Sequence, residues 1–218
     1  RVVNVLVVGE GGREHALVWS LARSPVVDSV VAAPGNPGIA ELGPCMELGK
    51  ALASLDTFDL AVIGPEAPLV AGIVDRFEAA GLVIFGPSAG AAQLEGSKTF
   101  TKEFLARHNI PSAAYRSFTD LDAACVYAAN QTIPIVIKAD GLAAGKGVII
   151  AHSHADADAC IRDMLSANRF GEAGHRVVIE DFLVGEEASY ICIVDGEQVL
   201  PMASSQDHKA RDNGDLGP

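Results

Sequence analysis

The sequence lacks the features that mark secreted, membrane-spanning or zinc-binding proteins. Its cysteines form no Cys-x-x-Cys pair, which argues against a zinc site or disulfide framework and favours reduced thiols in a cytosolic protein. No apolar run approaches the length that spans a bilayer, and the first residues lack the layout of a signal peptide. The sequence does not begin with Met, so its natural N-terminus has been trimmed or lies outside this sequence. These absences predict a cytoplasmic protein without a membrane partner.

Positive charge is also scarce. The sequence has 16 Lys and Arg against 28 Asp and Glu, a formal net charge of −12. Duplex nucleic acid binds basic surfaces, so this charge argues against a nucleic-acid partner. It does not exclude nucleotides, which arrive with magnesium and bind at local positive sites. The abundant residues are apolar (49%) and glycine (22 in number), as in a compact α/β enzyme of one large or two modest domains.

Apolar runs and helical segments alternate through the first third of the sequence. The expected strands are 2–8, 27–33, 60–63 and 82–85, and the expected helices are 16–23, 51–55 and 73–80. Such alternation predicts a parallel sheet. Its strands end in Gly/Pro loops, which gather at the edge where open α/β folds bind ligands. Because these loops carry Arg13, His15, Asn36 and Glu66, we expect a site there instead of simple turns.

The first of these loops runs from Gly9 to His15 and leads from a strand into a helix. This layout suits a phosphate group at a helix N-terminus. It departs from the dinucleotide fingerprint because Glu14 stands where the third glycine is required, and no acidic residue closes a clear second strand. A nicotinamide-dependent oxidoreductase is therefore a disfavoured hypothesis, and a titration that shows no NAD binding would dispose of it.

The middle of the sequence is expected to be helical over 89–108, with a break near Gly96 and a cap at Ser97. Lys98 and Lys102 then share one helix face, which for lysines is usually a solvated one. Thr119 is expected to cap a helix over 121–129. The remaining expected elements are a helix over 154–166 and strands over 177–184, 185–194 and 197–203.

A glycine-rich loop over 140–147 joins two β-branched runs, which predict a β-hairpin. Lys138 and Lys146 place two cations beside exposed amides, which suits a polyphosphate. The loop is not a Walker A loop: only three residues separate Gly141 from Gly145, and Gly147 stands where Ser or Thr is needed. Two interpretations stay open: a hairpin that closes over a nucleotide, and an ordinary hairpin with solvated lysines.

Motifs spread over nearly the whole chain resemble those of the phosphoribosylamine–glycine ligase family, also called glycinamide ribonucleotide synthetase. They are Gly11–His15, Pro34–Gly38, Gly64–Leu69, Gln93–Lys98, Lys138–Gly147, Glu186–Ser189 and Gln206–Lys209. Each motif alone is weak, but the ordered set is specific. The resemblance implies an ATP-grasp ligase of de novo purine synthesis. It implies a Rossmann-like parallel-sheet (pre-ATP-grasp) domain over 1–97 and a partial ATP-grasp domain over 98–218.

The same resemblance implies a small lid subdomain over about 113–180 and the start of a large subdomain at 181–218. The implied reaction joins glycine to 5-phosphoribosylamine. ATP phosphorylates the glycine carboxylate, and the amine displaces phosphate from glycyl phosphate to give glycinamide ribonucleotide. Closure of the glycine-rich loop would exclude water from this intermediate.

The resemblance also implies site residues, with ATP and Mg²⁺ as cofactors. The implied phosphate contacts are Lys102, Lys138, Gly145, Lys146 and Gly147, of which Lys138 and Lys146 are catalytic. The implied adenine contacts are Glu180, Asp181, Phe182 and Leu183, and Glu187 would accept from the ribose. The implied phosphoribosylamine contacts are Gly11, Gly12, Arg13, Asn36, Pro65 and Glu66. Asp207, His208 and Lys209 would line the glycine or phosphoribosylamine side. Neither His15 nor His208 is assigned a proton-transfer role.

The sequence departs from this family in two places. It stops at Pro218, where the family continues with Asn-Thr-Gly-Gly-Met-Gly, so the magnesium-binding Glu and Asn are expected beyond it and no metal ligand is named. The segment between Gly38 and Leu60 is short, and a strand and part of a helix are expected to be missing around 41–45. Oligomeric state is left open.

Two further alternatives remain. One is another purine-pathway ATP-grasp enzyme, a carboxylase or formate-using transformylase, against which the motifs at 64–68 and 206–209 argue. The other is a non-catalytic module that binds ATP without turnover.

Overall fold

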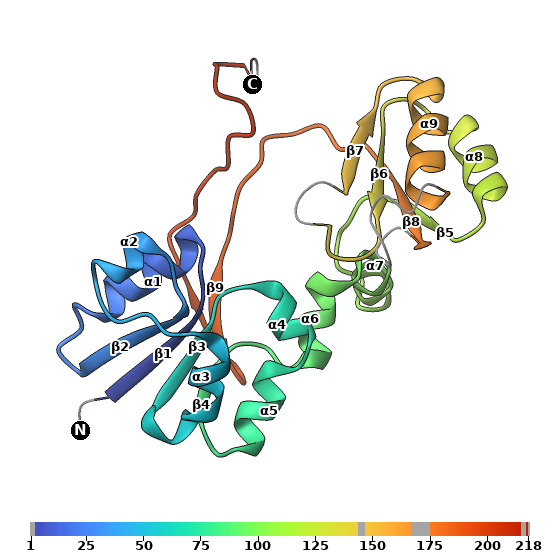
Figure 1. Ribbon diagram of the computed structural model, residues 1–218. Coiled ribbons are helices and arrows are strands. Elements are labelled where there is room, and N and C mark those ends of the chain that lie inside the picture. The colour runs from blue at the N-terminus through green and yellow to red at the C-terminus, as the bar shows by residue number, and fades with distance from the viewer. Residues whose placement is uncertain (1–2, 144–146, 167–174, 215–216, 218) are drawn as a thin grey trace. The chain divides into compact units, whose positions relative to one another are not determined.

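The computed structural model describes residues 3–143, 147–166, 175–214 and 217. The chain divides into two compact units, residues 1–181 and 182–218, and each is considered by itself. The first unit contains two four-stranded sheets, and the second contains a two-stranded one (Figure 1). The domain boundary expected between residues 97 and 98 stays a prediction.

The first sheet is parallel, as the alternating pattern predicts. Its strands are β1 (Val3–Gly9), β2 (Val27–Pro34), β3 (Leu60–Ile63) and β4 (Val83–Phe85), in the order β2-β1-β3-β4. Val5 to Val8 of the central strand β1 are all buried, so their side chains fill cores on both faces of the sheet. Val5 and Val7 belong to one core and Leu6 and Val8 to the other, because successive side chains of a strand point to opposite faces.

Helices cover both faces of this sheet (Figure 1). They are α1 (Gly12–Leu21), α2 (Pro37–Ala40), α3 (Leu48–Ala53), α4 (Glu66–Val70) and α5 (Ile73–Ala79), with a 3₁₀ turn at Leu55–Thr57. Helix α1 begins at Gly12, earlier than the expected residue 16, because Gly11 is its N-cap. Around 41–45, where a strand was expected to be missing, the structure has an isolated parallel bridge between Ala32 and Cys45.

Two helices follow the first sheet, α6 (Ala89–Gly96) and α7 (Lys98–Arg107). The expected break lies between them, and the Ser97 hydroxyl accepts the N–H of Phe100 at 3.1 Å as the predicted cap. The cap predicted at Thr119 is wrong. Asp120 caps helix α8 (Leu121–Ala129) because its carboxylate, directly before the first turn, accepts the N–H of Ala123 at 2.8 Å.

The second sheet is antiparallel, in the order β5-β8-β6-β7. Its strands are β5 (Tyr115–Phe118), β6 (Ile135–Ala139), β7 (Val148–Ala151) and β8 (Val177–Asp181). The pairing of β6 with β7 confirms the predicted hairpin, whereas β5 was not predicted. Helices α8 and α9 (His154–Leu165) pack on one face, over the buried side chains of Ile135 and Ile137. Lys138 alternates with these residues and lies on the other face.

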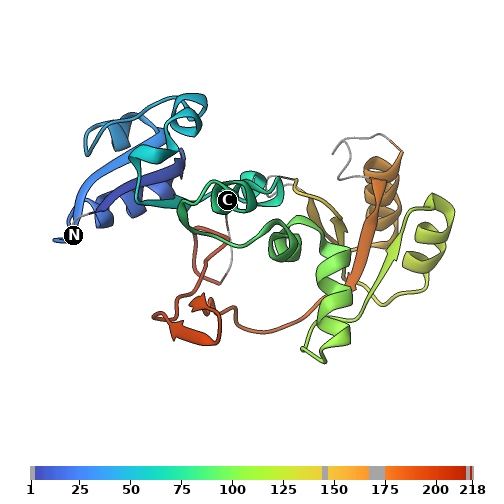
Figure 2. The ribbon, with the colours of Figure 1, turned by 90° about the horizontal axis from the view of Figure 1, so that it is seen from below.

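The second unit contains a hairpin of β9 (Cys192–Asp195) and β10 (Gln198–Pro201), drawn in orange and red in Figure 2. Both strands are shorter than expected. A further antiparallel bridge between Ser189 and Ser205 continues the pairing beyond β9. All four cysteines are free thiols. Among the described helices, none has the length and apolar character to cross a membrane.

Candidate functional site

Two strands of the second sheet place Lys138 and Glu180 next to each other. Val136 pairs directly with Glu180, so Lys138, two residues further along β6, is the diagonal neighbour of Glu180 on the same face. The Nζ of Lys138 lies 3.0 Å from Oε2 of Glu180. Lys102 reaches that same oxygen from helix α7, also at 3.0 Å. A single carboxylate oxygen is therefore shared by two ammonium groups.

The two lysines differ in what else they bind. Lys102 is 8% exposed, and its Nζ also donates to Oγ of Ser112 at 2.7 Å and to the carbonyl of Ala113 at 3.1 Å. An ammonium group has three N–H donors, so these partners and Glu180 use all of them. The Lys138 side chain is 26% exposed, and Glu180 is its one hydrogen-bond partner among the described residues. Lys138 therefore has donors left for an anion, whereas Lys102 mainly orients Glu180.

Glu180 has an unused acceptor. The residue is 6% exposed, and its Oε1 is buried without a hydrogen-bond partner in the described part of the chain. Buried polar atoms are nearly always paired, since desolvation without a partner is costly. Oε1 of Glu180 can therefore accept a hydrogen bond from a further donor.

A cavity of about 200 Å³ adjoins this cluster, and we call it the lysine cavity. Its lining residues are Leu94, Glu95, Lys98, Thr101, Lys102, Lys138 and Glu180. Lys98 is the one of its three lysines for which no role was predicted from the sequence. Its Nζ donates to the carbonyl of Gly141 at 2.9 Å, and burial lowers the pKa of its ammonium group despite the nearby Asp140 carboxylate. The shared helix face of Lys98 and Lys102 was the available signal.

Asp140 joins helix α7 to the start of the glycine-rich loop. Its carboxylate accepts the N–H of Thr99 at 2.7 Å and the hydroxyl of Ser97 at 3.1 Å, and its carbonyl accepts the N–H of Lys98 at 3.0 Å. These bonds fix Lys98 relative to the strand that carries Lys138. Of the predicted loop residues, Gly145 and Lys146 lie outside the described residues. Gly147 ends the loop, and its carbonyl accepts the N–H of Ala139 at 2.8 Å.

The expected adenine contacts fall at the boundary between the two units. Asp181 ends β8, and its backbone N–H donates to the carbonyl of Ala114 at 3.0 Å, so this N–H is not free for adenine. Phe182 and Leu183 begin the second unit and are 37% and 68% exposed. Their assignment to adenine stays a prediction.

The loops at the carboxyl edge of the first sheet are linked through Arg13. Its Nη1 donates to the carbonyl of Gly64 at 2.7 Å, and Nη1 and Nη2 both lie 3.1 Å from Oε1 of Glu66. A hydrogen bond from its own backbone, together with Arg13, lowers the pKa of the Glu66 carboxyl group despite partial burial. Pro65 lies between these two partners as the N-cap residue of α4. Three of the predicted substrate residues are therefore brought together.

Other predicted residues of this edge have structural partners. Asn36 donates from Nδ2 to the carbonyl of Glu10 at 2.8 Å and caps α2 by accepting the N–H of Ile39 at 2.9 Å. The N–H of Gly11 donates to Glu14 at 2.6 Å. Gly12 is open: a Cβ added there would have no neighbour within 4 Å. Asn36 therefore holds loops in place, and its contact with a substrate stays a prediction.

In the second unit, Lys209 lies between two carboxylates. Its Nζ is 3.3 Å from Oε1 of Glu187 and also contacts Asp207. The hydrogen bond to Asp207, and to a smaller extent the one to Glu187, raises the pKa of Lys209. Glu187 lines a cavity of about 370 Å³ with Glu186, Ala188, Ser204, Ser205 and Gln206. His208, between Asp207 and Lys209 in the sequence, is exposed. Glu187, expected to accept from the ribose, and two of the expected substrate residues, Asp207 and Lys209, thus lie together.

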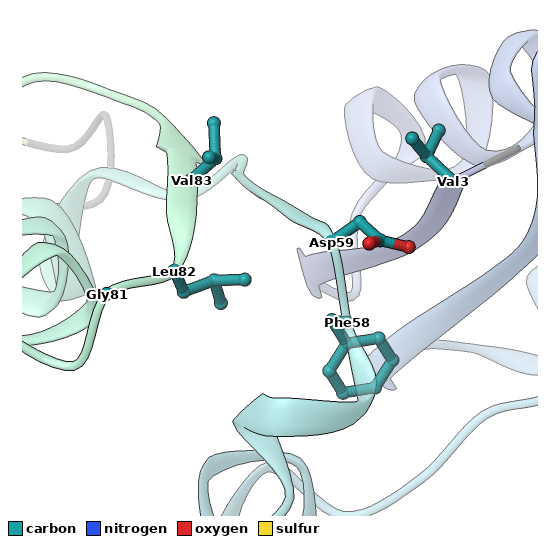
Figure 3. Close-up of a pocket in the computed structure, with 6 residues that line it drawn as sticks. All are labelled: Val3, Phe58, Asp59, Gly81, Leu82 and Val83. Carbon is teal, nitrogen blue, oxygen red and sulfur yellow. The ribbon is translucent and has the colours of Figure 1, made fainter. Parts of the chain in front are cut away.

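Another cavity, also of about 370 Å³, lies at the opposite edge of the first sheet (Figure 3). It is lined where β1, β3 and β4 begin, by Val3, Phe58, Asp59, Gly81, Leu82 and Val83. Asp59, the charged side chain among the described lining residues, accepts the N–H of Asn4 at 3.0 Å. Parallel sheets bind ligands at their carboxyl edge, so this amino-edge cavity is not the candidate site. Within the described residues, no group of His, Cys, Asp and Glu is arranged to hold a metal ion.

Comparison with known proteins gives matches along nearly the whole chain. The family models for the N domain and the ATP-grasp (A) domain of phosphoribosylglycinamide synthetase match residues 3–95 and 96–218. A phosphoribosylamine–glycine ligase from Salmonella typhimurium is 59% identical over 226 residues, covering 99% of this chain and 52% of that protein. The chain thus spans about half the length of the curated relatives it matches.

Solved structures agree with these matches. The phosphoribosylamine–glycine ligase of Thermotoga maritima has a TM-score of 0.83 at 31% identity, covering 99% of this chain and 53% of that one. A carboxyaminoimidazole ribonucleotide synthase of Aspergillus clavatus, solved with ATP, has a TM-score of 0.69 at 19% identity, covering 94% and 54%. The latter likeness shows the fold alone: a parallel-sheet region followed by an ATP-grasp-like region. With both family models matched, the chain belongs to the phosphoribosylglycinamide synthetase family.

Proposed function

We propose that the protein containing this chain ligates glycine to 5-phosphoribosylamine at the expense of ATP, giving glycinamide ribonucleotide, ADP and phosphate. The observation that carries the proposal is the lysine cavity, which Lys98, Lys138 and Glu180 line together; Oε1 of Glu180 is buried without a hydrogen-bond partner among the described residues. This pairing of cations with one free acceptor suits a nucleotide, whose phosphates need cations and whose adenine amine needs an acceptor. Family membership supports the same assignment.

In this proposal the adenine amine donates to Oε1 of Glu180, and Lys98 and Lys138 hold phosphate oxygens. The Lys98 contact modifies the expectation from sequence, which gave Lys102 that role. Lys102, which was predicted to contact phosphate, is proposed instead to fix Glu180. Gly145, Lys146 and Gly147 are proposed to cover the phosphates, with Lys146 as a further cation. Glu187 is the proposed acceptor for the ribose hydroxyls.

The chemistry needs positioning and positive charge more than covalent help from the protein. ATP supplies a phosphoryl group that turns the glycine carboxylate into a mixed anhydride. Attack by the amine of phosphoribosylamine forms the amide bond, breaks the bond between carbonyl carbon and phosphate oxygen, and releases phosphate and a proton. Lys138 stabilises negative charge on the transferring group, because its unused N–H donors lie in the lysine cavity. Mg²⁺, when bound, would offset negative charge on the phosphates, and no residue of this chain is named as its ligand.

The proposed phosphoribosylamine contacts lie on the loops of the first sheet. Arg13 and the N–H groups of the turn at Gly11 and Gly12 would bind its phosphate, and Glu66 its ribose hydroxyls. Pro65 and Asn36 would shape this site. Asp207, His208 and Lys209 are proposed to line the glycine side. We place the reaction in the cytoplasm, which the free thiols support.

The test uses the complete protein, purified and supplied with MgATP. Phosphoribosylamine is formed in place from ribose 5-phosphate and ammonia. ADP release and the mass of the product are followed with glycine, with bicarbonate or with formate as the carboxylate. Of the three carboxylates, we expect only glycine to give ADP and glycinamide ribonucleotide. ADP release that depends on bicarbonate or formate would overturn the proposal in favour of a carboxylase or transformylase.

A matched control excludes a contaminating ligase. Lys138→Met removes an ammonium group that has one protein partner in the described chain, and it should abolish turnover while the protein stays folded. Binding of ATP to the wild-type protein without turnover on any of the three carboxylates would instead support the non-catalytic module. No binding of ATP would exclude both.

A further inference from the structure

Glu14 is a buried carboxylate that the proposed reaction does not use. It lies in the first turn of α1, is 4% exposed, and its Oε2 accepts the N–H of Gly11 at 2.6 Å. This contact is one half of a capping box, in which a side chain of the first turn accepts the N–H of the N-cap residue; the other half is absent because Gly11 has no side chain. The position is the one where a dinucleotide-binding turn would have its third glycine. The structure therefore places an anion where such a turn leaves room for helix–strand packing.

Three glycines from two loops surround the Glu14 side chain. A Cβ at Gly9 would lie 2.6 Å from its Cδ, and one at Gly11 would lie 2.9 Å from Oε2. A Cβ at Gly64, at the end of β3, would overlap Oε1 directly. Real Cβ atoms do not approach other atoms this closely, so each of these positions accepts Glu14 because it has no side chain. The carboxyl group fills the gap between the loop after β1 and the loop after β3.

These two loops present the groups proposed to bind phosphoribosylamine. Arg13 directly precedes Glu14, and Glu66 lies two residues after Gly64. Arg13 holds the carbonyl of Gly64 and the carboxylate of Glu66, while Glu14 packs against Gly64 itself. The contact with Glu14 thus sets how closely Gly64 approaches helix α1. The hydrogen bond from Arg13 sets the orientation of the Gly64 carbonyl.

We propose that Glu14 is a positioning residue that fixes the spacing of the loops carrying Arg13 and Glu66 and so tunes binding of the sugar phosphate. The proposal rests on the proposed function for its substrate, but its geometry is independent of it. An acidic side chain suits the position because the helix N-terminus carries partial positive charge. The same carboxylate would repel a dinucleotide pyrophosphate at this turn.

The kinetic test compares Glu14→Ala with Glu14→Gln in the complete protein. The glutamine keeps the size of the side chain and an oxygen that accepts the N–H of Gly11, so its constants should stay within about twofold of wild type. The alanine empties the gap and should raise KM for phosphoribosylamine roughly tenfold or more, with KM for ATP and glycine unchanged. Glu10→Ala, an exposed residue of the same turn, is the matched control and should change nothing. An equal rise in all three KM values, or no rise, would overturn the proposal.

A second measurement does not depend on activity. Gly64→Ala alone should lower the unfolding midpoint by several degrees, about 5 °C or more, because its methyl group overlaps Glu14. Combined with Glu14→Ala, the same substitution should cost much less, since the space is then free. If Gly64→Ala alone does not fold, folding of the double variant is the supporting result. Additive losses would overturn the inference, even if the complete protein shows no activity toward phosphoribosylamine.

Discussion

Asp140 accepts the backbone N–H of Thr99 at 2.7 Å, so a residue at the end of the second sheet caps a helix that lies 41 residues earlier. The helix carries Lys98 and Lys102, and the strand before Asp140 carries Lys138. One side chain therefore fixes the relative position of the three cations around the lysine cavity. The helix has a second cap in Ser97, whose hydroxyl accepts the N–H of Phe100 and also donates to Asp140.

This relationship predicts that Asp140→Ala harms ATP binding more than stability. Loss of a cap should lower the free energy of unfolding by about 1 kcal/mol. Displacement of Lys98 from Lys138 should raise KM for ATP roughly tenfold. Thermal unfolding and steady-state kinetics of the complete protein measure the two effects.

Asp120→Ala is the matched control for Asp140→Ala. It removes the cap of α8, where the carboxylate accepts the N–H of Ala123 at 2.8 Å. It should cost about the same stability and leave KM for ATP unchanged. Equal effects of the two substitutions on KM would mean that Asp140 acts only as a cap.

Lys102 and Lys138 should separate into a structural and a binding residue. Lys102→Met leaves the buried carbonyl of Ala113 without this donor and Glu180 with Lys138 as its remaining cation, so the free energy of unfolding should fall by about 2 kcal/mol or more. Lys138→Met should cost less than about 1 kcal/mol, because the side chain is partly exposed and Glu180 keeps Lys102. The affinity of the Lys138→Met variant for ATP should fall roughly tenfold or more. Denaturant unfolding and calorimetric titration with ATP measure these effects, and the reverse ranking would contradict the assignment.

Lys98 should make stability depend on alkaline pH. Burial lowers its pKa below the usual 10.5, so between the folded-state pKa and 10.5 the unfolded chain holds more protons than the folded one. The free energy of unfolding contributed by this group therefore rises as pH rises through that window, and it is lowest when Lys98 is fully protonated. Unfolding of wild type and Lys98→Met should be compared from pH 7 upward. Lys50→Met, at an exposed position on α3, controls for loss of a lysine. The free energy of unfolding of wild type minus that of Lys98→Met should increase as pH rises. A decrease in this quantity with rising pH would contradict the prediction.

Gly35 should not tolerate a side chain. Its φ of +73° is a left-handed conformation, and a Cβ there would lie 2.5 Å from Sγ of Cys45 and 3.2 Å from Cβ of Ala32. Gly35→Ala should lower the free energy of unfolding by at least about 1–2 kcal/mol. Gly49→Ala, in helix α3 with only an ordinary contact to Glu47, should raise it by about 0.5–1 kcal/mol. Chemical denaturation of both variants measures the contrast. Equal changes in the free energy of unfolding would argue against the steric conflict at Gly35.

Local patterns predicted much of this fold. The buried run of β1 and the alternation of Ile135, Ile137 and Ala139 in β6 are periodic signals, and both strands lie where they were expected. Strand β5 was missed because Tyr115 to Phe118 is short and partly polar, and its pairing with β8 is a long-range contact. The start of α1 was misplaced because its cap is a glycine whose capping partner is Glu14. The cap of α8 was misplaced by one residue.

The site was harder to predict at the level of single residues. Lys98 and Lys102 occupy one helix face, so spacing alone cannot tell which of them reaches the cavity with free donors. That difference is set by Ser112 and Ala113, which approach Lys102 only in the folded chain. Asn36 was expected at a substrate, and the structure shows it bound to two loop backbones. Contacts of this kind depend on tertiary structure and leave no periodic trace in the sequence.

The pair of Arg13 and Glu66 has a consequence for any anion that arrives at the first sheet. The guanidinium fork already holds a carboxylate oxygen at 3.1 Å from two nitrogens. A phosphate that binds this same edge of the Arg13 guanidinium displaces Glu66, so binding there is an exchange of one anion for another. The displaced Glu66 is then free to turn toward hydroxyl groups next to that phosphate, and capture of one end of a ligand would release the acceptor for the other.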